Sequence, residues 1–243
     1  MNELKHIADF RKLLADYRPS AAARQILAET RLVLLVGPSS AGRNTIINEL
    51  VKTGAYHFIV SDTTRQPRTN NGVPEQNGRE YWFRTEEEVL AELERGEFLE
   101  AAIIHDQQVS GISIRELKRA RDANRIAINE VQIDGADNIN RFKPDTTIIF
   151  VTPPDFESWL ARLHARGTLP PLELRRRLES ARKEFEAALK YSYYKFVVNN
   201  KLEDSVAAVN ALATGGQYDP ATGAGGRTVV KGLLEATEEY LAQ

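Results

Sequence analysis

The chain has 243 residues, and its 32 lysines and arginines against 34 aspartates and glutamates give a formal net charge of −2. It has no cysteine, which excludes disulfides, thiolate metal sites and cysteine nucleophiles. The near-neutral charge argues against a protein that coats nucleic acid, and no apolar run approaches the roughly 20 residues that cross a bilayer. At ~100–200 residues per domain we expect one large domain with attachments. The first 20 residues lack an uninterrupted apolar stretch, so we expect no secretory signal and a cytoplasmic protein.

Residues 1–30 are predicted to form a helical N-terminal extension. Apolar residues recur there at steps of three and four, which places them on one helix face: Leu4, Ile7, Phe10, Leu13 and Leu14. Pro19 and Ser20 mark a break before a second short helix. We expect this extension to pack on the main domain or on a partner.

A core domain over 31–212 is predicted to be α/β. The strand candidates are the apolar runs at 32–36, 57–60, 125–131, 146–151 and 195–199. Helical patterns lie between most of them, including a long amphipathic one over 171–190 and a short one over 202–212, which predicts a parallel sheet flanked by helices. The glycine-rich segment 213–227 is predicted to be a flexible linker, and residues 228–243 a C-terminal helix.

A glycine-rich loop, GPSSAGRNT over 37–45, follows the first predicted strand. Phosphate oxygens must approach backbone N–H groups closely, and the helix that follows directs its positive end at the anion, so the frame G-x-x-x-x-G before a helix predicts a phosphate loop. The loop residues predicted to bind phosphate are Gly37, Ser39, Ser40, Ala41, Gly42, Arg43, Asn44 and Thr45. The alternative is a glycine-rich turn without a ligand.

Two positions of this loop depart from the usual pattern. Arg43 stands where lysine is usual, and its planar, forked guanidinium is wider than an ammonium. Asn44 stands where a serine or threonine normally serves magnesium, and it offers only a neutral amide oxygen, so we expect a weak Mg²⁺ ligand. The hydroxyl of Thr45 is turned about 100° away along the helix.

A second anion-binding segment is predicted at 61–68, SDTTRQPR. Arg65 and Arg68 lie on either side of Pro67, which stiffens the backbone. Two guanidinium forks on a rigid turn suit a dianionic phosphate, and Tyr81 adds a phenolic donor. The alternative is a polar loop with ordinary solvated arginines.

Taken together, these segments resemble the guanylate kinase family. The likeness continues through EQNGREYWF (75–83), GEFLE (96–100), AINEVQIDGA (127–136), the arginines of 162–177 and FVVNN (196–200), in the family's order. The resemblance implies a P-loop NTPase-like parallel sheet with a small inserted GMP-binding domain at about 61–112 and a lid at about 162–178. It also implies transfer of the ATP γ-phosphoryl group to GMP, with Mg²⁺.

The resemblance further implies roles for individual residues. For GMP binding it implies Ser61, Arg65, Arg68, Tyr81, Glu100, Glu130 and Gln132, and for catalysis Arg43, Arg162, Arg166 and Arg177. It assigns the loop residues named above to the binding of ATP, and it places Asn199 near the ATP adenine. The role implied for Glu100 is chemically sensible, because one carboxylate can accept both the N1–H and the exocyclic amine of guanine.

The chain also departs from the family's acceptor site. A tyrosine that helps to hold the GMP phosphate falls at Val109, and the guanine-contacting serine or threonine falls at Gly111, with Ser110 beside it. The second carboxylate of an acidic pair is an amide at Gln132, and a short insertion lies within TNNGVPEQ (69–76).

Three readings of the function therefore stay open. The first is a guanylate kinase-like phosphotransferase. It is favoured because a protein that no longer moved phosphate would have little need for the lid arginines. The second is a catalytically impaired module that binds a nucleotide or a phosphorylated ligand, and the third is a kinase for another monophosphate. For each, we expect small-molecule partners, no nucleic acid and no membrane, and we leave a homo-oligomer open.

Overall fold

The computed structural model describes residues 4–70, 72–104, 106–165, 169–216 and 220–242. The described helices are α1 (Ile7–Ala15), α2 (Ala21–Glu29), α3 (Arg43–Lys52), α4 (Glu86–Glu94), α5 (Ile114–Asp122), α6 (Ile133–Phe142), α7 (Phe156–His164), α8 (Pro171–Lys190), α9 (Leu202–Thr214) and α10 (Pro220–Leu241). The described strands are β1 (Leu32–Val36), β2 (Tyr56–Phe58), β3 (Asp62–Thr63), β4 (Thr69–Asn70), β5 (Val73–Pro74), β6 (Trp82–Phe83), β7 (Phe98–Ile104), β8 (Gln108–Ser113), β9 (Ile126–Glu130), β10 (Thr147–Thr152) and β11 (Lys195–Val198). Within these residues, no helix is both long enough and apolar enough to span a membrane.

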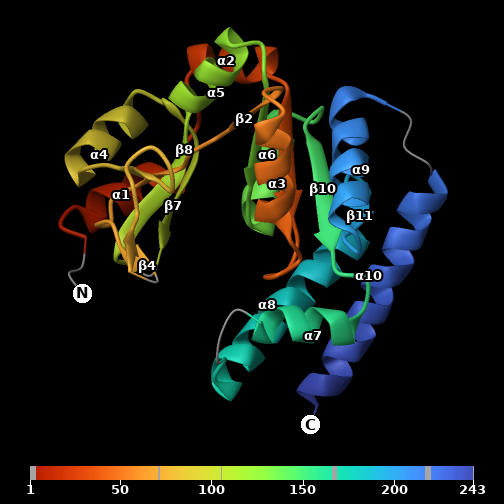
Figure 1. Cartoon of the computed structure of the whole chain (residues 1–243). Coiled ribbons are helices and arrows are strands. Elements are labelled where there is room, and N and C mark those ends of the chain that lie inside the picture. The colour runs from red at the N-terminus through yellow and green to blue at the C-terminus, as the bar shows by residue number, and fades with distance from the viewer. Residues whose placement is uncertain (1–3, 71, 105, 166–168, 217–219, 243) are drawn as a thin grey trace. The chain divides into compact units, whose positions relative to one another are not determined.

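The predicted central sheet is confirmed, with the strand order β11-β10-β1-β9-β2 (Figure 1). β1 pairs with β10, and β10 with β11, in parallel register, so their carboxyl ends lie at one edge. All five residues of β1 are buried, as its unbroken apolar run predicts for a strand covered on both faces. In open parallel sheets, ligands bind outside the carboxyl ends of the strands.

The chain divides into two compact units. Unit 1 comprises residues 1–31, 57–127 and 138–144, and unit 2 comprises 32–56, 128–137 and 145–243. Unit 1 contains a second sheet of order β6-β3-β8-β7, in which β8 is antiparallel to both β3 and β7. The predicted phosphate loop belongs to unit 2, and the predicted arginine segment belongs to unit 1.

The N-terminal helical region packs within unit 1. It forms two helices, α1 and α2, and the second begins at the predicted break, where the Ser20 hydroxyl accepts the backbone N–H of Ala23 (3.2 Å). α1 places Phe10, which is fully buried, in one apolar cluster with Val89 and Leu93 of α4 and with Phe98.

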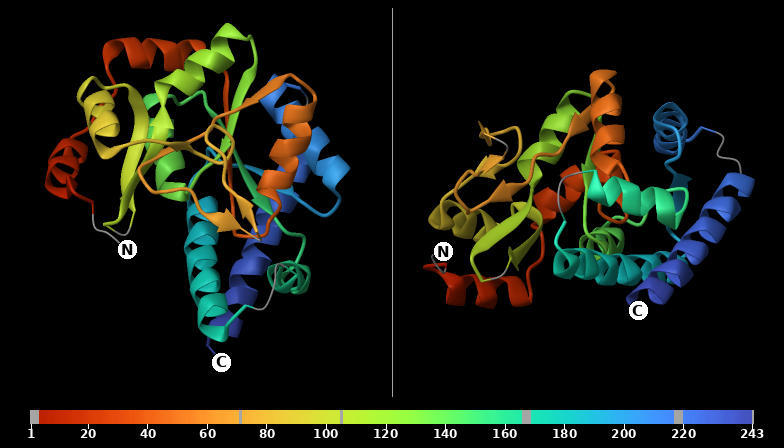
Figure 2. Two further views of the ribbon diagram at one scale, coloured as in Figure 1. Left: turned by 60° about the vertical axis from the view of Figure 1, so that its left-hand side comes forward. Right: turned by 60° about the horizontal axis from the view of Figure 1, so that its bottom comes forward.

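The C-terminal region departs from its prediction in one respect. α8 begins and ends as expected, but α10 already begins at Pro220, so residues 220–227 are helical and the predicted linker is wrong there. Glycine lowers helix propensity, yet packing decides here: α10 lies along α8 and β11 (Figures 1 and 2), and Gly226 faces Phe196 so closely that a Cβ would lie 2.5 Å from the Phe196 Cβ.

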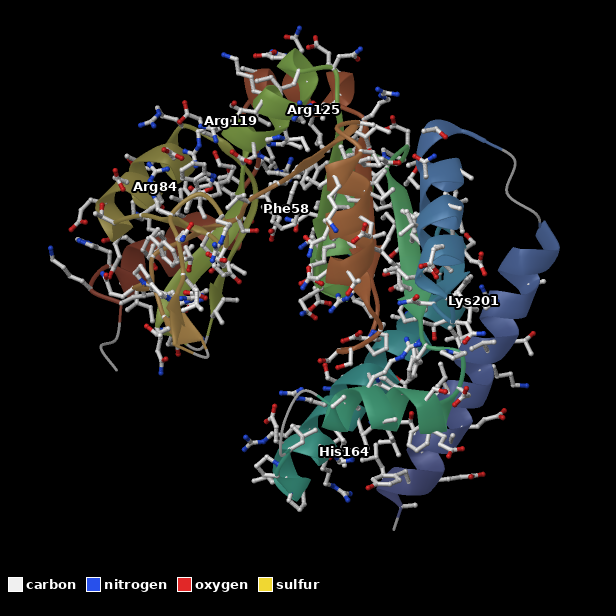
Figure 3. The ribbon with its side chains drawn as sticks, viewed as in Figure 1. Phe58, Arg84, Arg119, Arg125, His164 and Lys201 are labelled. Carbon is white, nitrogen blue, oxygen red and sulfur yellow. The ribbon has the colours of Figure 1, made fainter. Side chains whose placement is uncertain are left out.

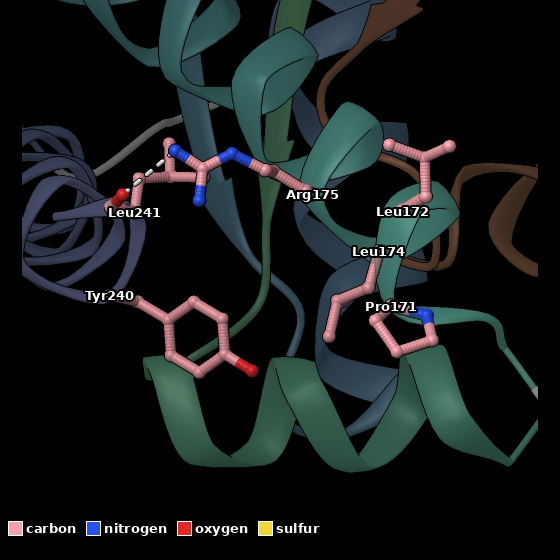
Figure 4. A pocket seen from close by; sticks show the side chains of 6 residues that line it. All are labelled: Pro171, Leu172, Leu174, Arg175, Tyr240 and Leu241. Atoms are coloured by element: carbon pink, nitrogen blue, oxygen red, sulfur yellow. Dashed lines mark hydrogen bonds between the residues drawn. The ribbon is translucent and has the colours of Figure 1, made fainter. Parts of the chain in front are cut away.

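The end of α10 is tied to the start of α8. Arg175 donates to the carbonyl oxygen of Leu241 (3.0 Å), as Figure 4 shows. A pocket lies beside this bond, lined by Pro171, Leu172, Leu174, Arg175, Tyr240 and Leu241 (Figure 4).

Two neighbouring glycines of α10 provide a matched test of this packing. Gly225→Ala is expected to raise the melting temperature, because alanine is favoured over glycine in a helix by about 1 kcal/mol and a Cβ there meets nothing within 4 Å. Gly226→Ala is expected to lower it, because overpacking costs about 1–3 kcal/mol. Equal melting temperatures of the two variants in calorimetry would contradict a docked helix.

Candidate functional site

The glycine-rich loop of unit 2 can hold only glycine at both of its frame positions. Gly37 has φ +137°, and a Cβ there would lie 2.1 Å from the carbonyl oxygen of Val151. Gly42 has φ +98°, and a Cβ there would lie 2.1 Å from Nδ2 of Asn199. Gly42 is also the N-cap of α3 and supplies no side-chain cap, so the first N–H groups of that helix face the loop. The loop therefore has the backbone of an anion site.

Two buried side chains hold the loop's carbonyl groups. Trp159 Nε1 donates to the carbonyl oxygen of Ser39 (2.8 Å), and Asn199 Nδ2 donates to that of Ala41 (2.7 Å). Asn199 Oδ1 in turn accepts the Ser205 hydroxyl (3.0 Å). Nδ2 of Asn199 therefore holds the loop, and Oδ1 holds the Ser205 hydroxyl of α9. The predicted place of Asn199 near the ATP adenine stays a prediction. Sequence reasoning missed this bracing, including the part of Trp159.

Arg43 and Asn44 both contact Glu130, at the carboxyl end of β9. Arg43 Nε lies 3.3 Å from one carboxylate oxygen, and Asn44 Nδ2 donates to the other (3.1 Å). Burial raises the pKa of Glu184 on α8, and the charge of Arg43 opposes that rise. Glu130, predicted for the acceptor site, thus lies beside the phosphate loop, whereas Gln132 is exposed.

The predicted lid arginines have different surroundings. Arg162 of α7, whose last residue His164 is labelled in Figure 3, donates to the backbone carbonyl of Asn199 (2.9 Å). Arg177 of α8 pairs with Glu173 one turn earlier (2.9 Å), with 32% of its side chain exposed. The remaining predicted lid arginine, Arg166, lies outside the described residues. Arg162 is therefore the one of these three that contacts the bracing of the loop among the residues described.

In unit 1, the two arginines predicted to bind one phosphate have different environments. Arg65 forms two parallel hydrogen bonds to Glu75 (2.6 and 2.9 Å) and lies over the ring of Tyr81 (4.8 Å). The hydrogen bonds to Glu75 raise the pKa of Arg65 further. The same carboxylate accepts the backbone N–H of Arg68 (2.8 Å), whose side chain is exposed. Arg65 and Glu75 thus fix the turn, and the turn presents the guanidinium of Arg68.

A buried ion network supports the strand that begins this segment. Asp62 is 1% exposed and accepts hydrogen bonds from Arg84 (3.2 Å) and Arg115 (2.7 Å). Arg84 lies next to α4 (Figure 3), where it also donates to Glu92 (2.7 Å). The network fixes β3 between Ser61, which is half-buried, and the arginine turn. Sequence reasoning did not find it, because its members are spread over 62–115.

Glu100 lies on the face of the second sheet opposite the apolar cluster that contains Phe98 and Val109. A register shift between Phe98 and Glu100 turns the strand, so that Phe98 is buried in the apolar cluster while Glu100 shares a face with Ser110. Burial raises the pKa of Glu100 to about 7. The Ser110 hydroxyl donates to that of Thr63 (2.9 Å) on the same face. A carboxyl group and two hydroxyls therefore line this face.

The same sheet explains two departures of the sequence. A Cβ at Gly111 would lie 2.4 Å from the carbonyl oxygen of Glu100, so no serine or threonine fits at that position. Ser110 instead places its hydroxyl on the face of Glu100. Val109 is 1% exposed in the apolar cluster and does not stand in for the family's tyrosine.

Comparison with known proteins gives one consistent family. The family model described as guanylate kinase matches residues 29–214. The chain is 37% identical over 187 residues to guanylate kinase of Corynebacterium efficiens, which covers 76% of this chain and 95% of that protein. It is 34% identical over 213 residues to guanylate kinase of a Synechococcus strain, covering 84% of this chain and 89% of that protein. The crystal structure of guanylate kinase from Anaplasma phagocytophilum has a similar fold, with a TM-score of 0.55 and 23% identity over 85% of this chain and 94% of that one.

Proposed function

Because the chain belongs to the guanylate kinase family, we propose that it transfers the γ-phosphoryl group of ATP to GMP, giving ADP and GDP. The observation that carries this proposal is the loop at 37–45. Its backbone is fixed by the bonds of Trp159 and Asn199 to the carbonyl groups of Ser39 and Ala41, and it leads directly into the N-terminus of α3, which attracts an anion. A module that only held a monophosphate in unit 1 would not need such a loop.

The donor site is assigned to unit 2. The N–H groups of the loop and of the first turn of α3 would hold the β- and γ-phosphates of ATP, and Thr45 would add a hydroxyl at the helix start. Arg43 would exchange its contact with Glu130 for a γ-phosphate oxygen, because a dianionic phosphate competes well with a carboxylate for a guanidinium. This exchange supplies a charge at the reacting group without a lysine.

Mg²⁺ fits the residues beside this loop. The amide of Asn44 and the carboxylate of Glu130 lie together there, and Mg²⁺ prefers oxygen ligands and keeps several of its waters while it binds substrate phosphates. No group of three or more His, Cys, Asp or Glu in the described part of the chain could hold a metal alone, so the site would be completed by ATP. When bound, the ion would neutralise charge on the β- and γ-phosphates. Asn44 and Glu130 would orient its water shell.

The acceptor site is assigned to unit 1. Arg68 and Tyr81 would hold the GMP phosphate, with Arg65 and Glu75 fixing the turn between them. Glu100 would accept the N1–H and the 2-amino group of guanine, and Ser61 and Ser110 would offer hydroxyls beside it. This assignment places a cation at the phosphate end and an acceptor group at the base end.

Phosphoryl transfer requires little covalent chemistry from the protein. An ionised oxygen of the GMP phosphate attacks the γ-phosphorus, the bond from that phosphorus to the β,γ-bridging oxygen breaks, and the electron pair stays on ADP. Such transfer depends on positioning and on charge neutralisation. We assign this neutralisation to Arg43, Arg162 and Arg177, while the role of Arg166 stays a prediction. Exclusion of water by a closing lid would direct the transfer to GMP.

A coupled assay with ATP, Mg²⁺ and each of GMP, dGMP, AMP, UMP and CMP tests the function. We expect ADP production with GMP, weaker production with dGMP and none with the other acceptors. No ADP with any acceptor, together with GMP binding in calorimetry, would overturn the kinase and favour a binding module. The cytoplasmic location and a homo-oligomer stay predictions.

The two arginines of the acceptor turn should respond differently to alanine. Arg68→Ala is expected to raise the KM for GMP about 10- to 100-fold, the loss of one charge-assisted hydrogen bond, with an unchanged melting temperature, because its side chain is exposed. Arg65→Ala is expected to raise the KM for GMP and also to lower the melting temperature. The variant loses the cation that pairs with Glu75, whose side chain is only 7% exposed. The opposite pattern in the two measurements would reject this division of roles.

A further inference from the structure

We propose that the segment between α1 and α2 positions the guanine-reading Glu100, through the contacts of Tyr17 and Ser20 with the backbone of residues 96–98. The inference rests on the proposed function, because it assigns the reading of guanine to Glu100. Tyr17 and Ser20 lie before residue 29, where the family match begins. The family model therefore does not include them.

The first contact is made by one hydroxyl group. Tyr17 Oη donates to the carbonyl oxygen of Phe98 (2.9 Å) and accepts the N–H of the same residue (2.9 Å). In the order β6-β3-β8-β7, β7 is the edge strand, so the outer polar groups of its backbone need partners other than a strand. Tyr17 supplies a donor and an acceptor to one residue of that edge, as a neighbouring strand would.

The second contact holds the turn that leads into β7. Ser20 donates its backbone N–H to the carbonyl oxygen of Gly96 (2.9 Å). Gly96 has φ +67°, and a Cβ there would lie 2.6 Å from the Ser20 nitrogen. The start of α2 and this turn therefore lie against each other with no room for a side chain.

These contacts act immediately before the irregularity that directs Glu100. The register shift falls between Phe98 and Glu100, and Leu99, which is 2% exposed, is the one residue between them. A displacement of Phe98 along the edge of β7 would move the register shift, and with it the carboxylate of Glu100. Phe10 of α1 and Phe98 belong to one apolar cluster, and Tyr17 packs against the same cluster, so the segment that follows α1 is held in the core of unit 1.

The geometry of a hydrogen-bonded base reader determines how well it separates similar bases. GMP and IMP differ only in the 2-amino group, and a site built to bond a group rejects the analogue that lacks it. A misplaced Glu100 would lose mainly its bond to that amine. The ratio of kcat/KM for GMP to that for IMP therefore reports on the position of the carboxylate and not on the general stability of the fold.

The test is Tyr17→Phe in the full chain, which removes the hydroxyl and keeps the ring. We expect the KM for GMP to rise and the GMP/IMP ratio to fall, each about tenfold, with an unchanged KM for ATP. Tyr56→Phe is the matched control, because Tyr56 donates to Asn210 (2.8 Å) from a buried position in unit 2. Tyr56→Phe should lower the melting temperature about as much as Tyr17→Phe does, because each variant loses one hydrogen-bonded hydroxyl, but it should leave the GMP/IMP ratio unchanged.

A double-mutant cycle separates positioning from folding. In a Glu100→Gln background, Tyr17→Phe should change the GMP/IMP ratio by less than twofold, because no carboxylate remains to be misplaced. Gly96→Ala, which forces Ser20 away from the turn, should reproduce the effect of Tyr17→Phe in the wild-type background.

The outcomes distinguish this inference from the proposed function. A wild type that makes no ADP from GMP, or a Glu100→Gln variant with normal GMP kinetics, would overturn the assignment of Glu100. If Glu100→Gln loses the GMP/IMP preference while Tyr17→Phe and Gly96→Ala keep it within twofold, the positioning role alone is overturned.

Discussion

Gly42→Ala is expected to lower kcat/KM for ATP by at least about a hundredfold, the order of loss that misplacing a reacting group by an ångström produces. The residue has φ +98°, which an L side chain rarely adopts, and its Cβ would lie 2.1 Å from Nδ2 of Asn199. Relief of that contact must move either the loop or the side chain that holds the carbonyl of Ala41. In both cases the N–H groups assigned to ATP lose their common direction.

The matched control for this variant is Gly232→Ala in α10, where a Cβ meets nothing within 4 Å. It adds the same methyl group and is expected to keep full activity. The measurement is steady-state kinetics with ATP varied at saturating GMP, beside thermal unfolding of both variants. A folded Gly42→Ala variant with kcat/KM within threefold of the wild type would show that the loop does not hold the donor phosphates.

The parts of the site that could be predicted are those encoded in short stretches of sequence. The phosphate loop needs glycine where the chain turns sharply, and Gly37 and Gly42 are both readable within one segment after a buried strand. The long helix over 171–190 repeats its apolar residues through five turns, so its limits follow from the pattern. In such segments, local preference and tertiary packing agree.

The parts that escaped prediction depend on contacts between distant segments. Tyr17 meets Phe98 across 81 residues, and no pattern around either residue indicates the other. Glu75 lies ten residues from Arg65, beyond a segment without helical or strand periodicity. The strands β3 and β6 have two residues each, too few for an alternating pattern. At α10, the low helix propensity of the glycines predicted a linker. The segment is helical because the packing of Gly226 on Phe196 outweighs that propensity.

Glu100→Gln is expected to abolish the preference for GMP and to change how activity depends on pH. The neutral amide keeps the shape of the side chain, but its nitrogen can no longer accept the second guanine donor. Loss of charge-assisted hydrogen bonds of about 1.5–3 kcal/mol each predicts a fall in kcat/KM for GMP of at least about tenfold at pH 8. The fall should be smaller for IMP, which offers Glu100 one donor fewer.

The sign of the pH effect follows from the raised pKa of Glu100, about 7 in the folded chain. Only the ionised carboxylate accepts both guanine donors, so the KM for GMP should fall as the pH rises from 6 to 8, by about tenfold for a group that titrates at 7. The GMP phosphate titrates near pH 6, and this contribution is common to wild type and variant. The difference between their two pH profiles therefore isolates Glu100, and coincident profiles would reject its role.

The stability of the fold should fall as the pH rises, whereas the affinity for GMP should increase. A carboxyl whose pKa rises from 4.5 in the unfolded chain to about 7 in the folded chain favours folding while it is protonated, and this contribution, about 3 kcal/mol at most, is lost as the pH rises from about 4.5 to 7. Glu100→Gln removes the loss, so the variant should unfold at a higher temperature than the wild type at pH 8 and at a similar temperature at pH 4.5. A carboxylate that lowers the stability of the fold at the pH where it binds guanine best is expected of a residue retained for recognition. A Glu100→Gln variant less stable than the wild type at pH 8 would show that Glu100 serves the fold instead.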